Sequence, residues 1–195
     1  MNDVKSCLLV GVGGQGAILI SKIMSNGFMK AGYDVKQSEV HGMAQRGGSV
    51  STQVRWGKKV YGSVFGKGEA DIMVALEKME AVRYAEFLNP NGVAVINDYA
   101  IKSTTIASGA EEYPQGCIEA MQKNFKTIAV PASDIAIQLG NPKCMNVVLF
   151  GAMCDSLGCP DIDWEQIVAE TVPAKVKELN LKAFRAGREA AKNAK

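Results

Sequence analysis

The sequence SCLLVGVGGQG, residues 6–16, joins a short apolar run to a loop that holds four glycines. An apolar run of this length that ends in glycine is typical of a buried β-strand. Apolar and small residues then recur at helical spacing as far as Gly32, which is suited to end a helix. They are Ile20, Ile23, Met24, Gly27 and Ala31. Because residues 33–38 have the pattern of a second strand, the chain opens as a β-α-β unit and predicts an α/β domain.

The rest of the chain predicts both parallel and antiparallel strands. Residues 50–56 and 60–65 flank a glycine-bearing turn, a pattern that predicts a β-hairpin. Further elements are expected as strands at 71–76, 92–97 and 127–130, a helix over 77–88, a turn at 89–92, a polar loop at 102–115, a helix that starts near Pro131 and helical structure from Cys144 onward. We therefore expect one domain over residues 1–195, a three-layer Rossmann-like α/β fold with a mixed, mostly parallel sheet and a helical C-terminus.

The composition is that of an ordinary folded protein and argues against two classes of partner. Apolar residues make up 47% of the chain and charged residues 22%, and the net charge of +2 comes without a long basic run. A nucleic-acid partner is therefore not expected. No apolar stretch is long enough to span a bilayer, and the N-terminus has the pattern of a strand rather than a signal peptide. We expect a cytoplasmic protein without membrane contact.

The cysteines and the histidine argue against a metal site in this chain. The five cysteines are an odd number, which does not suit a disulfide framework. Iron–sulfur clusters need closely spaced thiolates, whereas the nearest pair, Cys154 and Cys159, has no third ligand close by. A zinc site is not expected either, because His41 is the single histidine.

The glycine loop, residues 11–16, fits the pattern G-x-G-x-x-G between a strand and a helix. Gly11 permits a tight turn, Gly13 lets a phosphate approach the backbone, and Gly16 lets helix and strand pack closely. Possible anion contacts are therefore Gly11, Gly13, Gly14, Gln15 and Gly16. Taken alone, the motif indicates a dinucleotide site, with Glu39 as the ribose-binding acid, about as well as it indicates an empty tight turn.

A second loop, SEVHGMAQRGGSV at residues 38–50, lies just beyond the carboxyl end of a predicted strand. It gathers Glu39, His41, Gln45 and Arg46 between glycines, which let the backbone turn sharply. An arginine in such a loop can clamp a carboxylate or a phosphate at two points. A structural role, such as an ion pair between Glu39 and Arg46, explains any single residue equally well. The combination favours a binding or catalytic site.

These two loops together closely resemble the gamma-type domain of 2-oxoacid:ferredoxin oxidoreductases. The form with His41 before GMAQRGG is most similar to the small (beta) subunit of indolepyruvate:ferredoxin oxidoreductase, an enzyme of anaerobic metabolism. The resemblance continues through GEAD at 68–71, LE at 76–77 and NLKAFRAG at 180–187, so it covers essentially the whole chain.

The resemblance implies a subunit of an oxidoreductase that converts a 2-oxoacid, such as an arylpyruvate or indolepyruvate, to acyl-CoA and passes electrons to ferredoxin. Thiamine diphosphate, magnesium and [4Fe–4S] clusters would belong to the large (alpha) partner subunit, with coenzyme A as co-substrate. This chain would hold no cofactor and would be inactive alone. Arg46, with Gln45 and His41, would lie near an anionic group of coenzyme A or of the substrate.

Other interpretations stay open at this point. The chain could instead be a free-standing NAD(P)- or nucleotide-binding Rossmann-like module, or an assembly factor without contact with the reaction. In the last helix, Leu181 lies opposite an apolar stripe and is either a docking residue for the partner or a single exposed leucine. That stripe consists of Val176, Leu179, Ala183, Ala186 and Ala190. A homodimer of the isolated chain is also compatible with the sequence.

Overall fold

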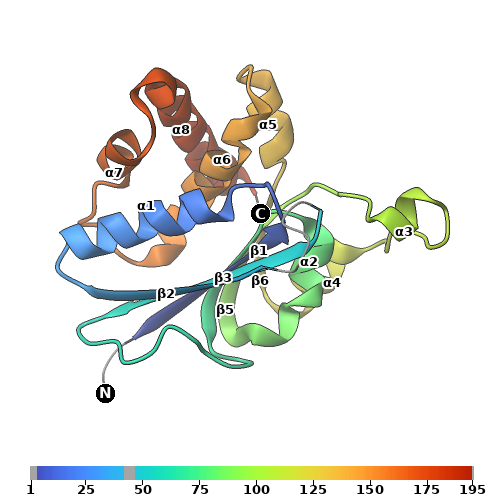
Figure 1. The fold of residues 1–195 in the computed structure, drawn as a ribbon, viewed down its shortest axis with the longest axis horizontal. Coiled ribbons are helices and arrows are strands. Elements are labelled where there is room, and N and C mark those ends of the chain that lie inside the picture. The colour runs from blue at the N-terminus through green and yellow to red at the C-terminus, as the bar shows by residue number, and fades with distance from the viewer. Residues whose placement is uncertain (1–3, 42–46, 195) are drawn as a thin grey trace.

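A twisted six-stranded sheet forms the centre of the computed structural model, which describes residues 4–41 and 47–194 (Figure 1). The strands are β1 (Lys5–Val12), β2 (Asp34–His41), β3 (Ser49–Gly57), β4 (Ala70–Ala75), β5 (Leu88–Asn97) and β6 (Lys126–Val130). Their order across the sheet is β2-β3-β1-β4-β5-β6. β3 runs antiparallel to both of its neighbours, whereas β1, β4, β5 and β6 pair in parallel. The predicted mixed, mostly parallel sheet is confirmed.

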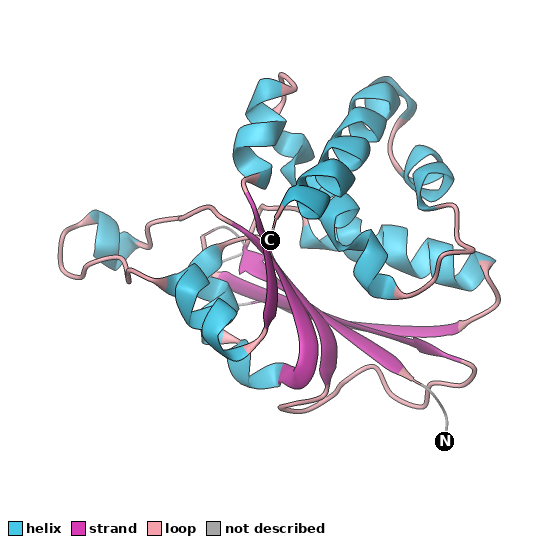
Figure 2. Cartoon of the chain, turned by 180° about the vertical axis from the view of Figure 1, so that it is seen from behind, coloured by secondary structure: helices cyan, strands magenta, loops and turns pink. Residues whose placement is uncertain are grey.

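Helices cover both faces of the sheet and make the three layers that the sequence predicted (Figures 1 and 2). One face carries α1 (Ala17–Lys30), α5 (Ala132–Gln138), α6 (Met145–Met153), α7 (Trp164–Thr171) and α8 (Lys177–Asn193). The other face carries α2 (Lys78–Arg83) and α4 (Cys117–Asn124), while α3 (Thr104–Ala107) stands off the body. Single 3-10 turns lie at Ala85–Phe87, Pro142–Cys144, Cys154–Leu157 and Ala174–Val176. No helix in the described part of the chain combines the length and apolar character that a membrane span requires.

The apolar run that opens the chain is buried on both sides, as expected for a strand inside a sheet that helices cover on both faces. Successive side chains of a strand point to opposite faces. Cys7 and Leu9 accordingly belong to the core under α1 and α5–α8, whereas Leu8 and Val10 belong to the smaller core under α2 and α4. β1 therefore lies between the two cores and holds the layers together.

The hairpin expected over 50–56 and 60–65 is wrong in its second half. The antiparallel strand is present as β3, but residues 60–65 form a loop along the sheet. Their backbone bonds to side chains instead of to a strand. The Phe65 N–H donates to Gln53 Oε1 at 2.8 Å, and the Val60 N–H donates to Asp34 Oδ2 at 2.9 Å. With these groups satisfied by side chains, the segment does not need a ladder of strand pairing.

The predicted helix over 77–88 and turn at 89–92 also differ from the structure. The helix ends at Arg83 and is followed by a 3-10 turn, and β5 begins at Leu88. Residues 89–92 form the irregular start of β5, where the register with β4 shifts. The Asn91 N–H donates to Asn89 Oδ1 at 2.9 Å, so the turn chemistry is present but lies within the strand.

α6 and α8 touch backbone to backbone at two glycines. A Cβ atom added to Gly187 would lie 1.8 Å from the carbonyl oxygen of Val148, and one added to Gly151 would lie 2.1 Å from that of Phe184. Nonbonded heavy atoms rest at about 3.5 Å or more. Both positions therefore require glycine for the helices to approach this closely.

Leu181 is buried at 9% exposure, so the hypothesis that it docks a partner is wrong. The buried face of α8 is Asn180, Leu181, Ala183, Phe184 and Gly187, and it shares only Ala183 with the predicted stripe. The large ring of Phe184 and the close approach at Gly187 set this rotation of the helix, because the predicted stripe offers mostly small alanine side chains.

Replacing Leu181 with glutamate should therefore destabilise the chain rather than detach a partner. The change removes a buried apolar side chain and buries a carboxylate in its place, so we expect the free energy of unfolding to fall by about 3–5 kcal/mol. Urea unfolding of the isolated chain measures this, with Lys182→Glu at an exposed neighbouring position as the control. Full stability of Leu181→Glu, with lost co-purification of a partner, would restore the docking hypothesis.

Candidate functional site

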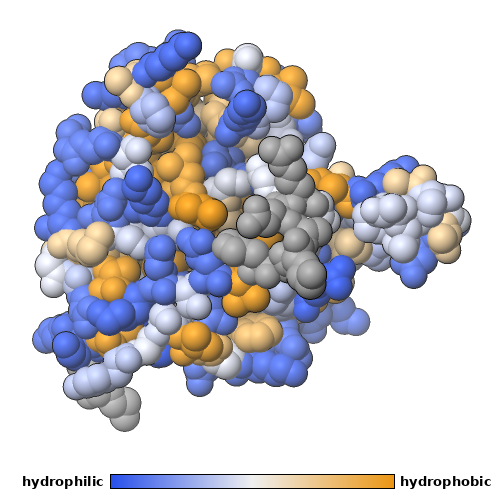
Figure 3. Space-filling view, viewed as in Figure 1, coloured by the Kyte–Doolittle hydropathy of each residue, from blue (hydrophilic) through white to orange (hydrophobic). Residues whose placement is uncertain are grey.

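The carboxyl ends of β1, β4, β5 and β6 meet at one edge of the sheet, where α/β folds place their ligands. The glycine loop follows β1 at this edge and separates two pockets. The β3 pocket, of about 350 Å³, is lined by Val12, Ile18, Val50 and Thr52 together with the loop. The α5 pocket, of about 400 Å³, is lined by Tyr99, Ile101, Ser133, Ile137, Pro142, Lys143, Met145 and Asn146 together with the loop. Apolar side chains gather near the N-terminal end of α1 on this side of the molecule (Figure 3).

Gln15 closes the glycine loop with its side chain. Its Oε1 accepts the Val12 N–H at 2.7 Å, and its Nε2 donates to the Leu76 carbonyl oxygen at 2.9 Å, which links the end of β1 to the end of β4. A Cβ atom at Gly11 would lie 2.9 Å from that same Oε1. The side-chain amide of Gln15 is thus committed to the protein. The first backbone N–H groups of α1, as at the start of any α-helix, have no partner within the helix.

Glycine is required at position 16 because the loop lies very close to Asn146 of α6, a contact that the sequence motif does not reveal. Its φ of +87° is in the left-handed region, and a Cβ atom there would lie 2.2 Å from Nδ2 of Asn146 on α6. Asn146 Nδ2 donates to the Gly16 carbonyl oxygen at 3.2 Å. Gly14 is also left-handed, with a φ of +102°, but has open space around it. Gly16 therefore packs the loop against α6, whereas Gly14 needs glycine only for its backbone conformation.

The second loop is joined to the glycine loop at its base. The Gly13 N–H donates to the Gly48 carbonyl oxygen at 2.8 Å, and the Gly47 N–H approaches the Gly13 carbonyl oxygen at 3.5 Å. Gln45 and Arg46 lie outside the described residues, as does the side chain of His41 at the end of β2. The structure thus brings the two candidate loops together by their backbones.

Glu39 lies on β2 opposite Thr52 of β3, and both side chains point to the face that carries α1. Thr52 lines the β3 pocket, so Glu39 is beside that pocket. β3 separates β2 from β1, however, which places Glu39 two strand spacings, roughly 10 Å, from the strand that bears the glycine loop. A ribose-binding acid belongs on the strand next to that loop, so the topology does not support the dinucleotide interpretation.

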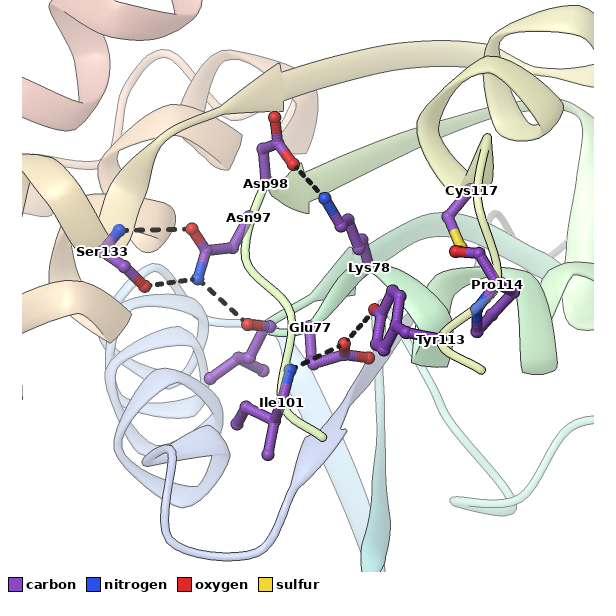
Figure 4. Close-up of polar contacts among 10 residues, drawn as sticks. Glu77, Lys78, Asn97, Asp98, Ile101, Tyr113, Pro114, Cys117 and Ser133 are labelled. Atoms are coloured by element: carbon purple, nitrogen blue, oxygen red, sulfur yellow. Dashed lines mark hydrogen bonds and ion pairs between the residues drawn. The ribbon is translucent and has the colours of Figure 1, made fainter. Parts of the chain in front are cut away.

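Glu77 is a buried carboxylate directly after β4 that the sequence pointed to only through the resemblance (Figure 4). It caps α2 by accepting the Glu80 N–H at 3.0 Å, and its other oxygen accepts the Ile101 N–H at 3.2 Å and the hydroxyl of Tyr113. Burial, with the bond to Glu77 second, raises the pKa of Tyr113, which remains a neutral donor. Glu77 thereby fixes the segment that supplies one wall of the α5 pocket.

Lys78 also fixes the segment that contributes Tyr99 and Ile101 to the α5 pocket. Its Nζ pairs with Asp98 Oδ1 at 2.8 Å, and its backbone N–H donates to the Tyr99 carbonyl oxygen at 3.1 Å. The bond to Asp98 raises the pKa of Lys78, so this ion pair persists at neutral pH. Tyr99 and Ile101 are therefore held in place by the first turn of α2.

Asn97, at the end of β5, is fully buried and was missed by sequence reasoning. Its Nδ2 donates to the Leu76 carbonyl oxygen at 3.0 Å and to Ser133 Oγ at 2.9 Å, and its Oδ1 accepts the Ser133 N–H at 3.2 Å (Figure 4). The signal that could have found it is an amide directly after an apolar run, at the sheet edge where ligands bind.

The surroundings of the cysteine thiols raise their pKa values. Burial is the largest cause that raises the pKa of each one, and the affected residues are Cys7, Cys117, Cys144, Cys154 and Cys159. Metal ions bind the thiolate form, which burial disfavours. Within residues 4–41 and 47–194, no three histidine, cysteine or acidic side chains group as metal ligands.

Residues 6–190 match the protein family described as pyruvate ferredoxin/flavodoxin oxidoreductase. The chain belongs to this family, and it is a subunit of a 2-oxoacid:ferredoxin oxidoreductase, as the two loops predicted. It is 41% identical to the indolepyruvate oxidoreductase subunit IorB of Archaeoglobus fulgidus over 92% of each chain, and 36% identical to that of Pyrococcus horikoshii over 95% of each.

Solved structures share the fold. The gamma subunit of a keto/oxoacid ferredoxin oxidoreductase from Geobacter sulfurreducens superposes with a TM-score of 0.70 at 26% identity, covering 97% of this chain and 99% of that one. A 2-oxoglutarate:ferredoxin oxidoreductase from Magnetococcus marinus superposes with a TM-score of 0.75 at 18% identity, over all of this chain and 32% of that one. The second similarity concerns the fold alone and shows that this fold also occurs within a longer chain.

Proposed function

We propose that this chain is the small subunit of a thiamine diphosphate-dependent 2-oxoacid:ferredoxin oxidoreductase whose substrates are arylpyruvates such as indolepyruvate. The complex would decarboxylate the 2-oxoacid oxidatively, transfer the acyl group to coenzyme A and pass the electrons to ferredoxin. The observation that carries this proposal is the pairing of the glycine loop with the second loop at the carboxyl edge of the sheet. The IorB relatives, which match along nearly their whole length, support the choice of substrate class.

In this proposal, thiamine diphosphate, magnesium and the [4Fe–4S] clusters are held by a large (alpha) subunit. The spacing of the cysteines suits that division, because the nearest pair in sequence, Cys154 and Cys159, has no third cysteine close by. When bound to that subunit, thiamine diphosphate would supply the nucleophilic and electron-accepting chemistry that decarboxylation of a 2-oxoacid requires. The small subunit alone would be inactive, and it would act in the cytoplasm as a single domain of residues 1–195.

The contribution of this chain is to bind and orient an anionic group. The N–H groups at the start of α1 and the left-handed backbone at Gly14 and Gly16 face the pockets beside the glycine loop. The adjoining loop carries Arg46, with Gln45 and His41, and its base is bonded to Gly13. These groups together suit a phosphate of coenzyme A or the carboxylate of the substrate.

Co-expression with a large subunit tests the assignment. The expected result is a brown complex that reduces ferredoxin when both indolepyruvate and coenzyme A are supplied, whereas the small subunit alone gives no turnover. A colourless monomer that binds NADH, and neither associates with a large subunit nor supports turnover, would replace the proposal with the nucleotide-binding module.

Arg46→Ala should weaken the interaction of the complex with one anionic substrate. A charge-assisted, two-point contact is worth about 1.5–3 kcal/mol, so the KM for coenzyme A or for the 2-oxoacid should rise about 10- to 100-fold. Steady-state kinetics with each substrate varied in turn identify which anion Arg46 holds. Arg46→Lys keeps the charge but loses the planar guanidinium, so its KM should lie between those of the wild type and Arg46→Ala. Unchanged kinetics for both substrates, in a complex that assembles normally, would remove Arg46 from the site.

A further inference from the structure

A chain of hydrogen-bonded amides crosses the carboxyl edge of the sheet from the glycine loop to α5. Its junction is the carbonyl oxygen of Leu76, which accepts Gln15 Nε2 at 2.9 Å on one side and Asn97 Nδ2 at 3.0 Å on the other. Asn97 then reaches Ser133, at the start of α5, through two further bonds. The chain therefore passes over the ends of β1, β4 and β5 and finishes after β6.

The orientation of the Asn97 amide is fixed by its partners. The Ser133 N–H can meet only an acceptor, and the Leu76 carbonyl oxygen can meet only a donor, so the amide cannot be flipped. The side chain is fully buried, where an unpaired donor or acceptor is costly. Asn97 consequently holds both neighbours in one arrangement.

Asn97 also supplies the cap that α5 does not provide for itself. The N-cap residue of α5 is Pro131, which offers no side-chain cap, and the Ser133 N–H in the first turn is bonded by Asn97 Oδ1 at 3.2 Å instead. A capping bond stabilises the start of a helix. The start of α5 is thus anchored on the end of β5.

Both ends of this hydrogen-bonded network line the α5 pocket. Gln15 lines it from the glycine loop, and Ser133 lines it from α5 beside the exposed side chain of Ile137. Lys143 adds a positive charge to the same lining. The separation of the two walls therefore depends on the bonds that meet at Asn97.

We propose that Asn97 is a positioning residue of the oxidoreductase, which sets the spacing between the glycine loop and α5 and thereby the affinity of the α5 pocket for coenzyme A. The proposal rests on the proposed function, which supplies coenzyme A as the ligand. Asn97 is fully buried and does not line the α5 pocket, so it would act through Leu76 and Ser133 rather than by contact with the ligand.

Asn97→Asp breaks the hydrogen-bonded network on one side of residue 97 with a minimal change of shape. The carboxylate can still accept the Ser133 N–H, but it can no longer donate to the Leu76 carbonyl oxygen, which it would repel. Asn180→Asp is the matched control. Asn180 is likewise buried and donates Nδ2 to the Val176 carbonyl oxygen at 2.8 Å, but it lies on α8. Ser133→Ala retains the Leu76 bond and serves as the milder variant.

In the complex with the large subunit, Asn97→Asp should raise the KM for coenzyme A about tenfold and leave kcat within about twofold, since misplacing a binding wall mainly affects binding. Asn180→Asp should lower thermal stability without this change in KM, and Ser133→Ala should change KM by less. Hydrogen–deuterium exchange should be about tenfold faster in Asn97→Asp at residues 13–17 and 132–135, and not in Asn180→Asp.

Two results would overturn the inference while the proposed function stands: an active complex in which Asn97→Asp leaves the KM for coenzyme A unchanged, or a rise in KM that Asn180→Asp matches. A wild-type complex without turnover on any 2-oxoacid would contradict the proposed function instead. The exchange measurement then decides, because unaltered exchange of the glycine loop in Asn97→Asp removes the coupling whatever the ligand.

Discussion

Gly187→Ala is expected to lower the free energy of unfolding by about 3 kcal/mol, which corresponds to a fall in melting temperature of about 6–12 °C for a chain of this size. The new methyl group would enter the space of the Val148 carbonyl oxygen, where its Cβ would lie 1.8 Å away. Backbone atoms cannot rotate aside as a flexible side chain can, so α6 and α8 must separate. That separation disturbs a helix, α6, in which every residue is buried.

The sign of this effect distinguishes packing from helix propensity. Alanine is favoured over glycine inside an exposed helix by about 1 kcal/mol, so propensity alone predicts stabilisation. Gly62→Ala is the matched control, because an added Cβ there meets no atom within 4 Å and the backbone has no positive φ. Thermal unfolding of both variants should show a large loss for Gly187→Ala and little change for Gly62→Ala. A stable Gly187→Ala protein would show that the helices are farther apart than described.

Gly16→Ala should reduce the kcat/KM of the complex for coenzyme A about 100-fold, the scale expected when reacting groups move by about 1 Å. Its Cβ would lie 2.2 Å from Asn146 Nδ2, and its φ of +87° is unfavourable for any residue with a side chain. The loop must shift away from α6, and the N–H groups at the start of α1 shift with it.

Gly14→Ala separates the two components of this effect. Gly14 has the same kind of backbone, with a φ of +102°, but an added Cβ meets nothing within 4 Å. It should therefore show only the conformational cost, about 1–2 kcal/mol of stability. The kinetic difference between the two alanine variants measures the contact with Asn146. Equal activity in both would mean that the contact between Gly16 and α6 has no part in binding.

Prediction of the fold from the sequence succeeded where the signal is local. It failed where an element depends on contacts with residues far along the chain. The run at residues 6–10 and the glycines that follow it contain their own strand and turn signals, and β1 lies where they placed it. Residues 60–65 have equally good strand composition, yet they form a loop in which the N–H groups of Val60 and Phe65 bond to side chains of earlier strands. The rotation of α8 depends on Phe184 and Gly187 facing α6, which no periodicity of alanines could indicate.

The site divides in the same way. The two loops can be recognised in the sequence by their glycines and unusual polar residues, and in the structure they are hydrogen-bonded to each other. Asn97 and Glu77 act through residues far along the chain, since Ser133 and Tyr113 each lie 36 positions further on. Only the fold reveals that these two polar side chains hold the walls of the α5 pocket.

The insertion of β3 between β1 and β2 has a consequence for the order of folding. β1 pairs with β3 on one side and β4 on the other, and both of these strands lie later in the chain, from Ser49 and Ala70 onward. We therefore expect β2 and β3, which are neighbours in sequence, to form the first antiparallel pair during synthesis, before β1 pairs with another strand. That early pair then offers an edge on which β1 can dock. In this order of folding, β1, which leads into the glycine loop, joins the sheet after β2 and β3, the strands that follow it in sequence.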